Sequence, residues 1–172
     1  MEIQEILKDA AGRPVFAARQ VLDSIDDETL HAMPSGGSSI AWLLWHAARQ
    51  ADVQTAMLAE GPQLWETSNW GERMGVDRGP DAMGFGDTQD DVAALRITNA
   101  VALCDYVAAT FDALNTYVET LESADYDEII DESYTPPTTR GVRIVSIIDD
   151  AIAHIAQAAY VRGIVGGWKI GY

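Results

Sequence analysis

Apolar residues recur at three- and four-residue intervals through most of the chain, the spacing that is typical of amphipathic helices. The pattern begins over 2–11, where a short helix is predicted to end near Gly12. Because proline suits the first turn of a helix, Pro14 is predicted to begin a separate helix over 14–25. No run of alternating apolar and polar residues is long enough to predict a sheet-based fold.

The next helix is the most apolar one. It is predicted to start from a serine N-cap at Ser38 or Ser39 and to run to about Glu60, where a Gly-Pro pair follows. Residues 61–87 are rich in glycine and have no sustained period. This segment is therefore predicted to be a long crossover or lid.

Two further helices complete the pattern. Thr88 with Asp91 three residues on resembles a capping box and is predicted to open the longest helix, over 88–122. After a stretch with two prolines, residues 142–165 predict a last long helix that ends at a Gly-Gly pair. The fold class that follows is all-α: a four-helix bundle with a long crossover between the second and third main helices. The length of 172 residues suits one domain, 1–172.

The net charge of the chain argues against two classes of partner. The formal net charge is −16, with 11 basic against 27 acidic residues, so neither nucleic acid nor an anionic membrane surface is expected as a partner. No stretch approaches 18 consecutive apolar residues, so no membrane span is expected. The start of the chain lacks the pattern of a signal peptide, and one cysteine, Cys104, suits a reducing compartment. We therefore expect a cytoplasmic protein in which Cys104 is a buried structural thiol.

His46 is unusual because it directly follows an apolar run, Ile40–Trp45, within a predicted helix. In the last helix Asp150 and His154 lie four residues apart, which places them on one face, about 40° and about 6 Å from each other. A carboxylate and an imidazole so placed can chelate one metal ion. His46 from a facing helix would complete a site of two histidines and one carboxylate with open positions.

Three neighbouring polar residues could support this site. Gln50 shares the face of His46, and Gln157 lies one turn beyond His154, so either amide could contact a ligand or a substrate. Arg49 could pair with a carboxylate of a substrate or cofactor; the alternative is a solvated helix arginine. Another interpretation also stays open for the main residues, in which Asp150 and His154 form an ordinary i,i+4 pair and His46 is a hydrogen-bonded core histidine.

The order and motifs of these helices resemble those of the DinB/YfiT-like superfamily over nearly the whole chain. "SIAWLLWH" is similar to the family's second-helix motif, which places His46 at the first metal-binding histidine. The family's last helix carries two histidines four residues apart, the second followed by a Gly-Gln pair. "DAIAHIAQ" matches this frame with His154 at the second histidine and Ala156-Gln157 at the Gly-Gln pair, but Asp150 replaces the first histidine.

The resemblance implies a divalent metal held by His46, Asp150 and His154, with zinc, nickel or iron as the candidates. It also implies an enzyme that uses a low-molecular-weight thiol, mycothiol or bacillithiol, as a transferase or isomerase acting on a small-molecule substrate. The family includes the metal-binding domain of mycothiol-dependent maleylpyruvate isomerase. The alternative is a metal-free helical-bundle binding or interaction module that keeps a degenerate site, because a carboxylate in place of an imidazole changes the metal preference.

Several residues are set apart from the site. His31 lies in a short connector, which is expected at the surface, and is not assigned to the metal. Trp65, Trp70 and Phe85 in the crossover could cover the mouth of the site or pack in the core. A homodimer is a further expectation, because the bundle carries long apolar helices.

Overall fold

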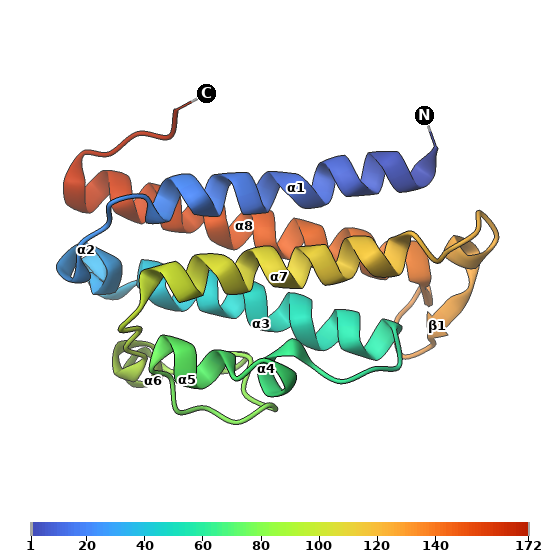
Figure 1. Ribbon diagram of the computed structural model, residues 1–172, viewed down its shortest axis with the longest axis horizontal. Helices are drawn as coiled ribbons and strands as arrows, with labels where there is room; N and C mark the ends of the chain where they lie inside the picture. Colours follow the sequence, from blue (N-terminus) through green and yellow to red (C-terminus); the bar gives the residue numbers. More distant parts are fainter. Residues whose placement is uncertain (1, 172) are drawn as a thin grey trace.

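The computed structural model describes residues 2–171 and shows a bundle of four long helices with a side layer of short ones (Figure 1). α1 and α3 occupy opposite corners, and each packs against both α7 and α8. The expected all-α four-helix bundle is confirmed. The elements of the described residues are α1 (Ile3–Leu22), α2 (Asp27–His31), η1 (Pro34–Gly36), α3 (Ile40–Leu58), α4 (Leu64–Thr67), α5 (Trp70–Met74), α6 (Gln89–Ala94), α7 (Ala100–Val118), η2 (Asp125–Asp127), β1 (Ile129–Asp131), β2 (Thr138–Thr139) and α8 (Arg140–Gly166).

The long crossover sets the relative directions of the four long helices. In Figure 1, α3 and α7 point in one direction and α1 and α8 in the other. Two consecutive helices can be parallel only if the chain returns along the bundle between them. Here residues 59–99, with α4, α5 and α6, make this return beside α3 (Figure 1). The predicted crossover between the second and third main helices is thus present, and it carries short helices of its own.

α1 is one continuous helix, so the predicted break near Gly12 and Pro14 is wrong. Pro14 lies inside the helix and is buried, in line with Ala11 and Ala18 on the face that enters the core. A proline removes one backbone hydrogen bond within a helix. We attribute the continuity to the packing of this apolar face against α7 and α8, which compensates for that loss.

The predicted helix over 88–122 is wrong as a single element. The capping box is present, since the Thr88 side chain accepts from the Asp91 N–H and the Asp91 carboxylate accepts from the Thr88 N–H, but the helix it opens, α6, is short. The chain then turns over residues 95–99, and the Asn99 side chain caps α7 by accepting from the N–H of Ala102 at 3.1 Å. Contacts with other segments hold this turn: the Thr98 N–H donates to the Met74 carbonyl at 2.9 Å.

His31 is also placed differently from the expectation. It lies in α2, and its side chain is 4% exposed instead of lying at the surface. Its Nε2 accepts a hydrogen bond from the Ile97 N–H at 3.0 Å, so it holds the turn before α7. His31 remains outside the metal-ligand cluster, as the sequence predicted.

α8 is the longest helix of the described residues, with 27 residues, and the β1–β2 hairpin precedes it. The side chain of Thr139 caps it by accepting from the Val142 N–H. Of the described helices, α8 alone has the length and apolar composition that a membrane crossing needs. In the structure it packs against α3 and α1 as an element of the bundle.

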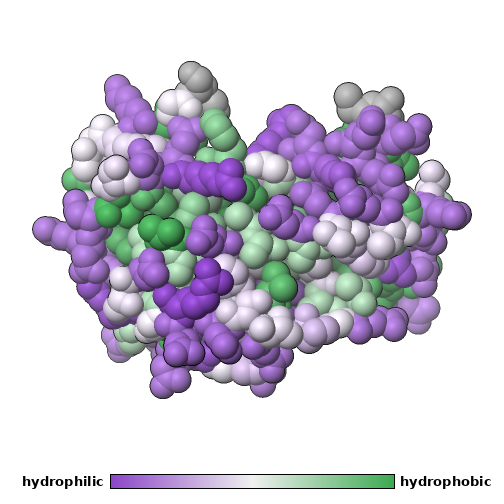
Figure 2. Space-filling view, viewed as in Figure 1, coloured by the Kyte–Doolittle hydropathy of each residue, from purple (hydrophilic) through white to green (hydrophobic). Residues whose placement is uncertain are grey.

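The aromatic residues of the crossover have different places. Trp65 and Trp70 are buried and both pack against Tyr106 of α7, so for these two the interpretation as core residues is the correct one. Phe85 is 91% exposed. On the face in Figure 2, hydrophilic side chains predominate around the edge and an apolar area lies over α7.

Candidate metal centre

His46 lies in the middle of α3, which begins where the Ser39 side chain accepts a hydrogen bond from the Trp42 N–H at 3.1 Å. All residues from 39 to 52 are buried, because the bundle covers one side of α3 and the crossover covers another. His46 is accordingly only 8% exposed. The apolar run before His46 is therefore explained by the burial of this part of α3 on all sides.

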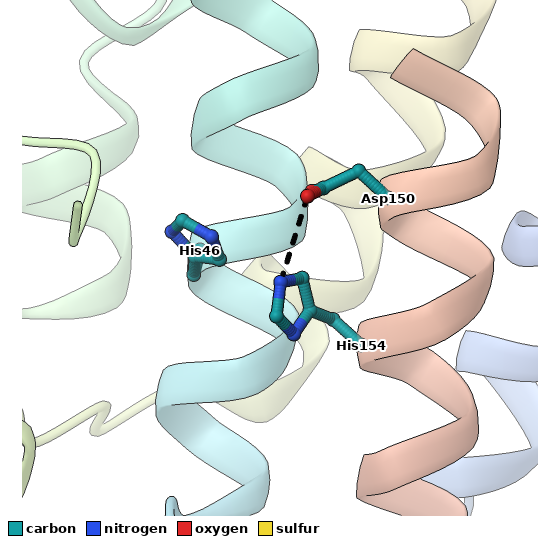
Figure 3. Close-up of side chains that lie close together, drawn as sticks. All are labelled: His46, Asp150 and His154. Carbon is teal, nitrogen blue, oxygen red and sulfur yellow. Dashed lines mark ion pairs between the residues drawn. The ribbon is translucent and has the colours of Figure 1, made fainter. Parts of the chain in front are cut away.

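The other two candidate ligands come from α8, which faces α3. Asp150 and His154 are one turn apart, and their side chains extend toward His46 (Figure 3). The His154 Nε2 lies 3.6 Å from the Asp150 Oδ1, and the rings of His46 and His154 are 4.7 Å apart at an angle of 81°. One ligand atom from each residue falls within 4.8 Å of the others. The structure thus brings the three predicted residues together.

Both imidazoles have their Nδ1 atoms occupied by oxygen acceptors. His46 Nδ1 bonds to the carbonyl of Met83, and His154 Nδ1 lies 3.0 Å from the Gln157 Oε1. A carbonyl oxygen accepts but cannot donate, so Nδ1 is the donor in both contacts, and a neutral imidazole that donates from Nδ1 has its lone pair on Nε2. This is the arrangement that metal-binding histidines adopt, with an outer acceptor that sets the tautomer and the ring orientation.

Asp150 adds an oxygen that lacks a partner. Its Oδ2 is buried and has no hydrogen bond within the described part of the chain. A buried polar atom without a partner is costly, and a cation bound beside it would remove that cost. The donor set of two imidazole nitrogens and one carboxylate oxygen therefore fits a divalent ion.

The distances are compatible with an ion after a small contraction. Ligand bonds of about 2.1 Å in a tetrahedral site place the ligand atoms roughly 3.4 Å apart. The contact between His154 and Asp150 already has this length, 3.6 Å. The remaining ligand atoms lie within 4.8 Å of one another, so the largest separation must shorten by about 1.4 Å, which side-chain rotations can supply.

Burial keeps the imidazole of His46 in its neutral form. Burial lowers the pKa of His46 below its usual value of 6.5, and the hydrogen bond with the Met83 carbonyl offsets only part of this effect. The imidazole is therefore neutral at neutral pH, which coordination requires. Trp42 stacks on His46 with ring centroids 4.8 Å apart and an interplanar angle of 9°, and it forms a T-shaped pair with His154 at 6.3 Å. This indole is one wall of the site.

The two glutamines proposed for a ligand or substrate both form hydrogen bonds within the protein. Gln157 contacts His154 directly through the Nδ1 bond, the position of an amide that supports a ligand. Gln50 is buried and donates to the Ile147 carbonyl at 2.9 Å, while its own oxygen accepts from Gln54 at 2.7 Å. Gln50 thus ties α3 to α8 near the cluster.

Arg49 is neither a solvated helix arginine nor free to bind a carboxylate. It is 0% exposed, and all five of its N–H donors are used by protein acceptors. The partners are Asp52 and Tyr106 for Nη1, Gln63 and the Pro80 carbonyl for Nη2, and the Ala82 carbonyl for Nε. No N–H is left for a substrate, so the predicted pairing of Arg49 with a substrate or cofactor carboxylate is wrong.

The sequence did not single out the crossover residues that touch the site. Met83 binds His46 through its backbone, and Asp87 accepts from the indole N–H of Trp42 at 2.8 Å. A backbone contact depends on no particular side chain, so periodicity and motif spacing carry no signal for Met83. The glycine content of 61–87 was the one available indication that the backbone comes close to other groups there.

Comparison with known protein families identifies the family of this chain. The family model described as the DinB superfamily matches residues 17–158, a range that includes His46, Asp150 and His154. The chain belongs to the DinB superfamily.

A solved structure supports the same assignment. This DinB-superfamily chain is similar to a conserved protein from Enterococcus faecalis whose crystal structure superposes with a TM-score of 0.90. The two are 30% identical, and the match covers 98% of this chain and 99% of that one. A search of curated proteins found no match.

Proposed function

We propose that this protein is a metal-dependent enzyme of the DinB type that holds one divalent ion with His46, Asp150 and His154. One observation carries the proposal: a ligand atom from each of His46, Asp150 and His154 lies within 4.8 Å of the others across two facing helices, and Asp150 also has a buried oxygen without a partner. Three protein ligands leave positions open for water or a substrate, as catalytic sites require.

The ligand set limits which metal ions can bind. Two histidines and one carboxylate suit zinc, and the same set with open positions suits non-haem iron(II). Nickel remains a candidate because imidazole binds it well. A calcium or magnesium site is disfavoured, because these ions take oxygen ligands.

A bound ion at an open site lowers the pKa of a thiol or a water molecule and so supplies a nucleophile at neutral pH. On this basis, and by similarity to the family, we propose that the co-substrate is a low-molecular-weight thiol such as mycothiol or bacillithiol. Asp150 is 39% and His154 21% exposed, which gives a small molecule access from the α8 side. The reaction would be a transfer or isomerisation of a small-molecule substrate in the cytoplasm.

A metal-free binding module is the second candidate. The observation that favours it is the spacing of Asp150 and His154, since an i,i+4 pair at 3.6 Å can persist without an ion. In that case His46 and His154 would line a polar pocket and bind a ligand directly.

Metal analysis separates the two candidates. Protein purified without a nickel column should contain one divalent ion per chain, and Asp150→Ala should lose it. Asp149→Ala is the matched control, because Asp149 is an exposed neighbour on the same helix. Equal metal content in Asp150→Ala and the wild type would remove Asp150 from the site, and no metal in either would favour the binding module.

Thiol use is tested on the cobalt form. If a thiol binds the ion, adding mycothiol or bacillithiol to cobalt-loaded protein should produce a thiolate-to-cobalt charge-transfer band. An unchanged spectrum at saturating thiol would refute the thiol-dependent reaction while leaving the metal site intact.

A further inference from the structure

The crossover is bound to α3 along one stripe of side chains. Trp42, His46 and Arg49 lie on successive turns, and each forms a hydrogen bond to the segment 80–87. Trp42 Nε1 donates to Asp87 at 2.8 Å, and Arg49 Nε donates to the Ala82 carbonyl at 3.1 Å. The segment therefore follows α3 in the reverse direction, and the middle contact of this series belongs to a candidate metal ligand.

Gly84 allows the segment to approach so closely. A Cβ atom at this position would lie 2.9 Å from His46 Nδ1, 3.0 Å from Trp42 Cζ2 and 3.1 Å from a carbon of the Trp45 ring. The φ angle of Gly84 is also +89°, a conformation that residues with a side chain rarely adopt. Any larger residue would move the backbone at Met83 away from His46.

The imidazole of His46 thus contacts the crossover on one side and the candidate ligands of α8 on the other. Its Nδ1–H donates to the Met83 carbonyl, which leaves Nε2 for the ion, and a ligand atom of the ring lies within 4.8 Å of those of Asp150 and His154. We propose that Met83, through its carbonyl, is the positioning residue of His46, and that Gly84 is what brings this carbonyl within reach. The crossover is then part of the metal centre. This inference rests on the proposed metal-binding function.

Linkage gives the proposal a second consequence. If the Met83 contact raises metal affinity by some factor, metal binding strengthens that contact by the same factor. The backbone around 82–86 should therefore exchange its amide hydrogens more slowly when the site is loaded. The crossover would respond to the ion although it supplies no ligand.

Three glycines of the crossover allow a controlled test. Gly84→Ala introduces a side chain against His46 at a positive φ. Gly86→Ala has a comparable φ of +84° but meets nothing within 4 Å, so it reports backbone strain alone. Gly79→Ala also meets nothing within 4 Å, and no positive φ is recorded there, so it should behave like the wild type.

Zinc affinity is the first readout. Loss of an outer acceptor typically weakens metal binding by about 10- to 100-fold, and we expect this loss in Gly84→Ala. Gly86→Ala and Gly79→Ala should stay within about threefold of the wild type, because neither added methyl group meets an atom within 4 Å. Equal zinc affinity in Gly84→Ala and the wild type, or an equal loss in Gly86→Ala, would overturn the positioning role.

The second readout needs no metal. Long-range ¹H–¹⁵N spectra of the apo protein should show His46 with its proton on Nδ1 in the wild type and in Gly86→Ala. Gly84→Ala should lose this fixed tautomer while its circular dichroism spectrum remains helical. A proton on Nε2 of His46 in the wild type would overturn the inference.

The two readouts separate the possible failures. Absence of zinc binding in the wild type, with the Nδ1 tautomer present, would refute the proposed metal site and leave the Met83–His46 contact established. Zinc binding in the wild type that is unaffected by Gly84→Ala would refute the inference and leave the proposed function standing.

Discussion

Replacing Arg49 by methionine should destabilise the protein far more than its position on a helix suggests. Methionine keeps most of the apolar length of the side chain but removes five hydrogen bonds and the positive charge. Asp52, which is 3% exposed and lies 3.1 Å from Arg49 Nη1, would keep its negative charge in a buried site. The Pro80 and Ala82 carbonyls would lose their donors at the same time.

The magnitude follows from the partners that remain. Removing one member of a buried ion pair costs about 3–5 kcal/mol. Asp52 would still accept from the Leu64 N–H, the Trp65 N–H and the Tyr106 hydroxyl, all at 2.7–2.8 Å. Burial raises the pKa of Tyr106, so its hydroxyl stays protonated and continues to donate. These three bonds place the expected loss at the lower end, about 3 kcal/mol.

Urea denaturation followed by tryptophan fluorescence measures this loss. For a chain of this size, about 3 kcal/mol corresponds to a fall in Tm of roughly 6–12 °C. Arg13→Met is the matched control, because Arg13 and Asp9 are both exposed, and such a pair contributes less than about 1 kcal/mol. A loss below about 1 kcal/mol in Arg49→Met would refute the assignment of Arg49 as a buried anchor of the crossover.

Three more predictions concern the ionisable groups. Without metal, the free energy of unfolding should fall as the pH drops below about 6.5, because burial lowers the pKa of His46 in the folded chain and the unfolded chain therefore binds the proton first. His46→Gln should reduce this slope in urea titrations between about pH 7.5 and pH 5, and an unchanged slope would contradict the assignment. Asp150→His should raise zinc affinity in a competition assay, because three histidines form a good zinc site; an unchanged affinity would argue that residue 150 does not contact the ion. Burial raises the pKa of the Cys104 thiol, so a disulfide reagent should label it at least about tenfold more slowly than free cysteine at pH 8, and a rate equal to that of free cysteine would disprove this.

Local rules account for much of what the sequence predicted. The period of apolar residues indicates which face of a helix enters the core, and the i,i+4 spacing alone places Asp150 and His154 side by side. The same periodicity predicted the four main helices and the absence of a large sheet. These features depend on residues within one or two turns of one another, so the sequence contains them directly.

The errors occurred where distant segments decide the local structure. α1 continues through Pro14 because its apolar face is packed, and the helix predicted over 88–122 breaks because the turn at 95–99 is held by α2 and α5. The side chain of His31 is buried for the same reason, since its partner is a backbone N–H 66 positions away. Helix propensity cannot report such contacts.

In the candidate metal centre, too, some features follow from the sequence and others from the packing of distant segments. The sequence by itself determined the three residue types of the candidate metal centre and the common face of Asp150 and His154. Only the tertiary structure decided that α3 turns His46 toward α8 and that the Met83 carbonyl accepts a hydrogen bond from His46. It also decided that Arg49 donates its hydrogen bonds to the crossover and not to a substrate. The physical reason is that a helix face is encoded every three or four residues, whereas a backbone carbonyl that arrives from a glycine-rich crossover has no side-chain signature.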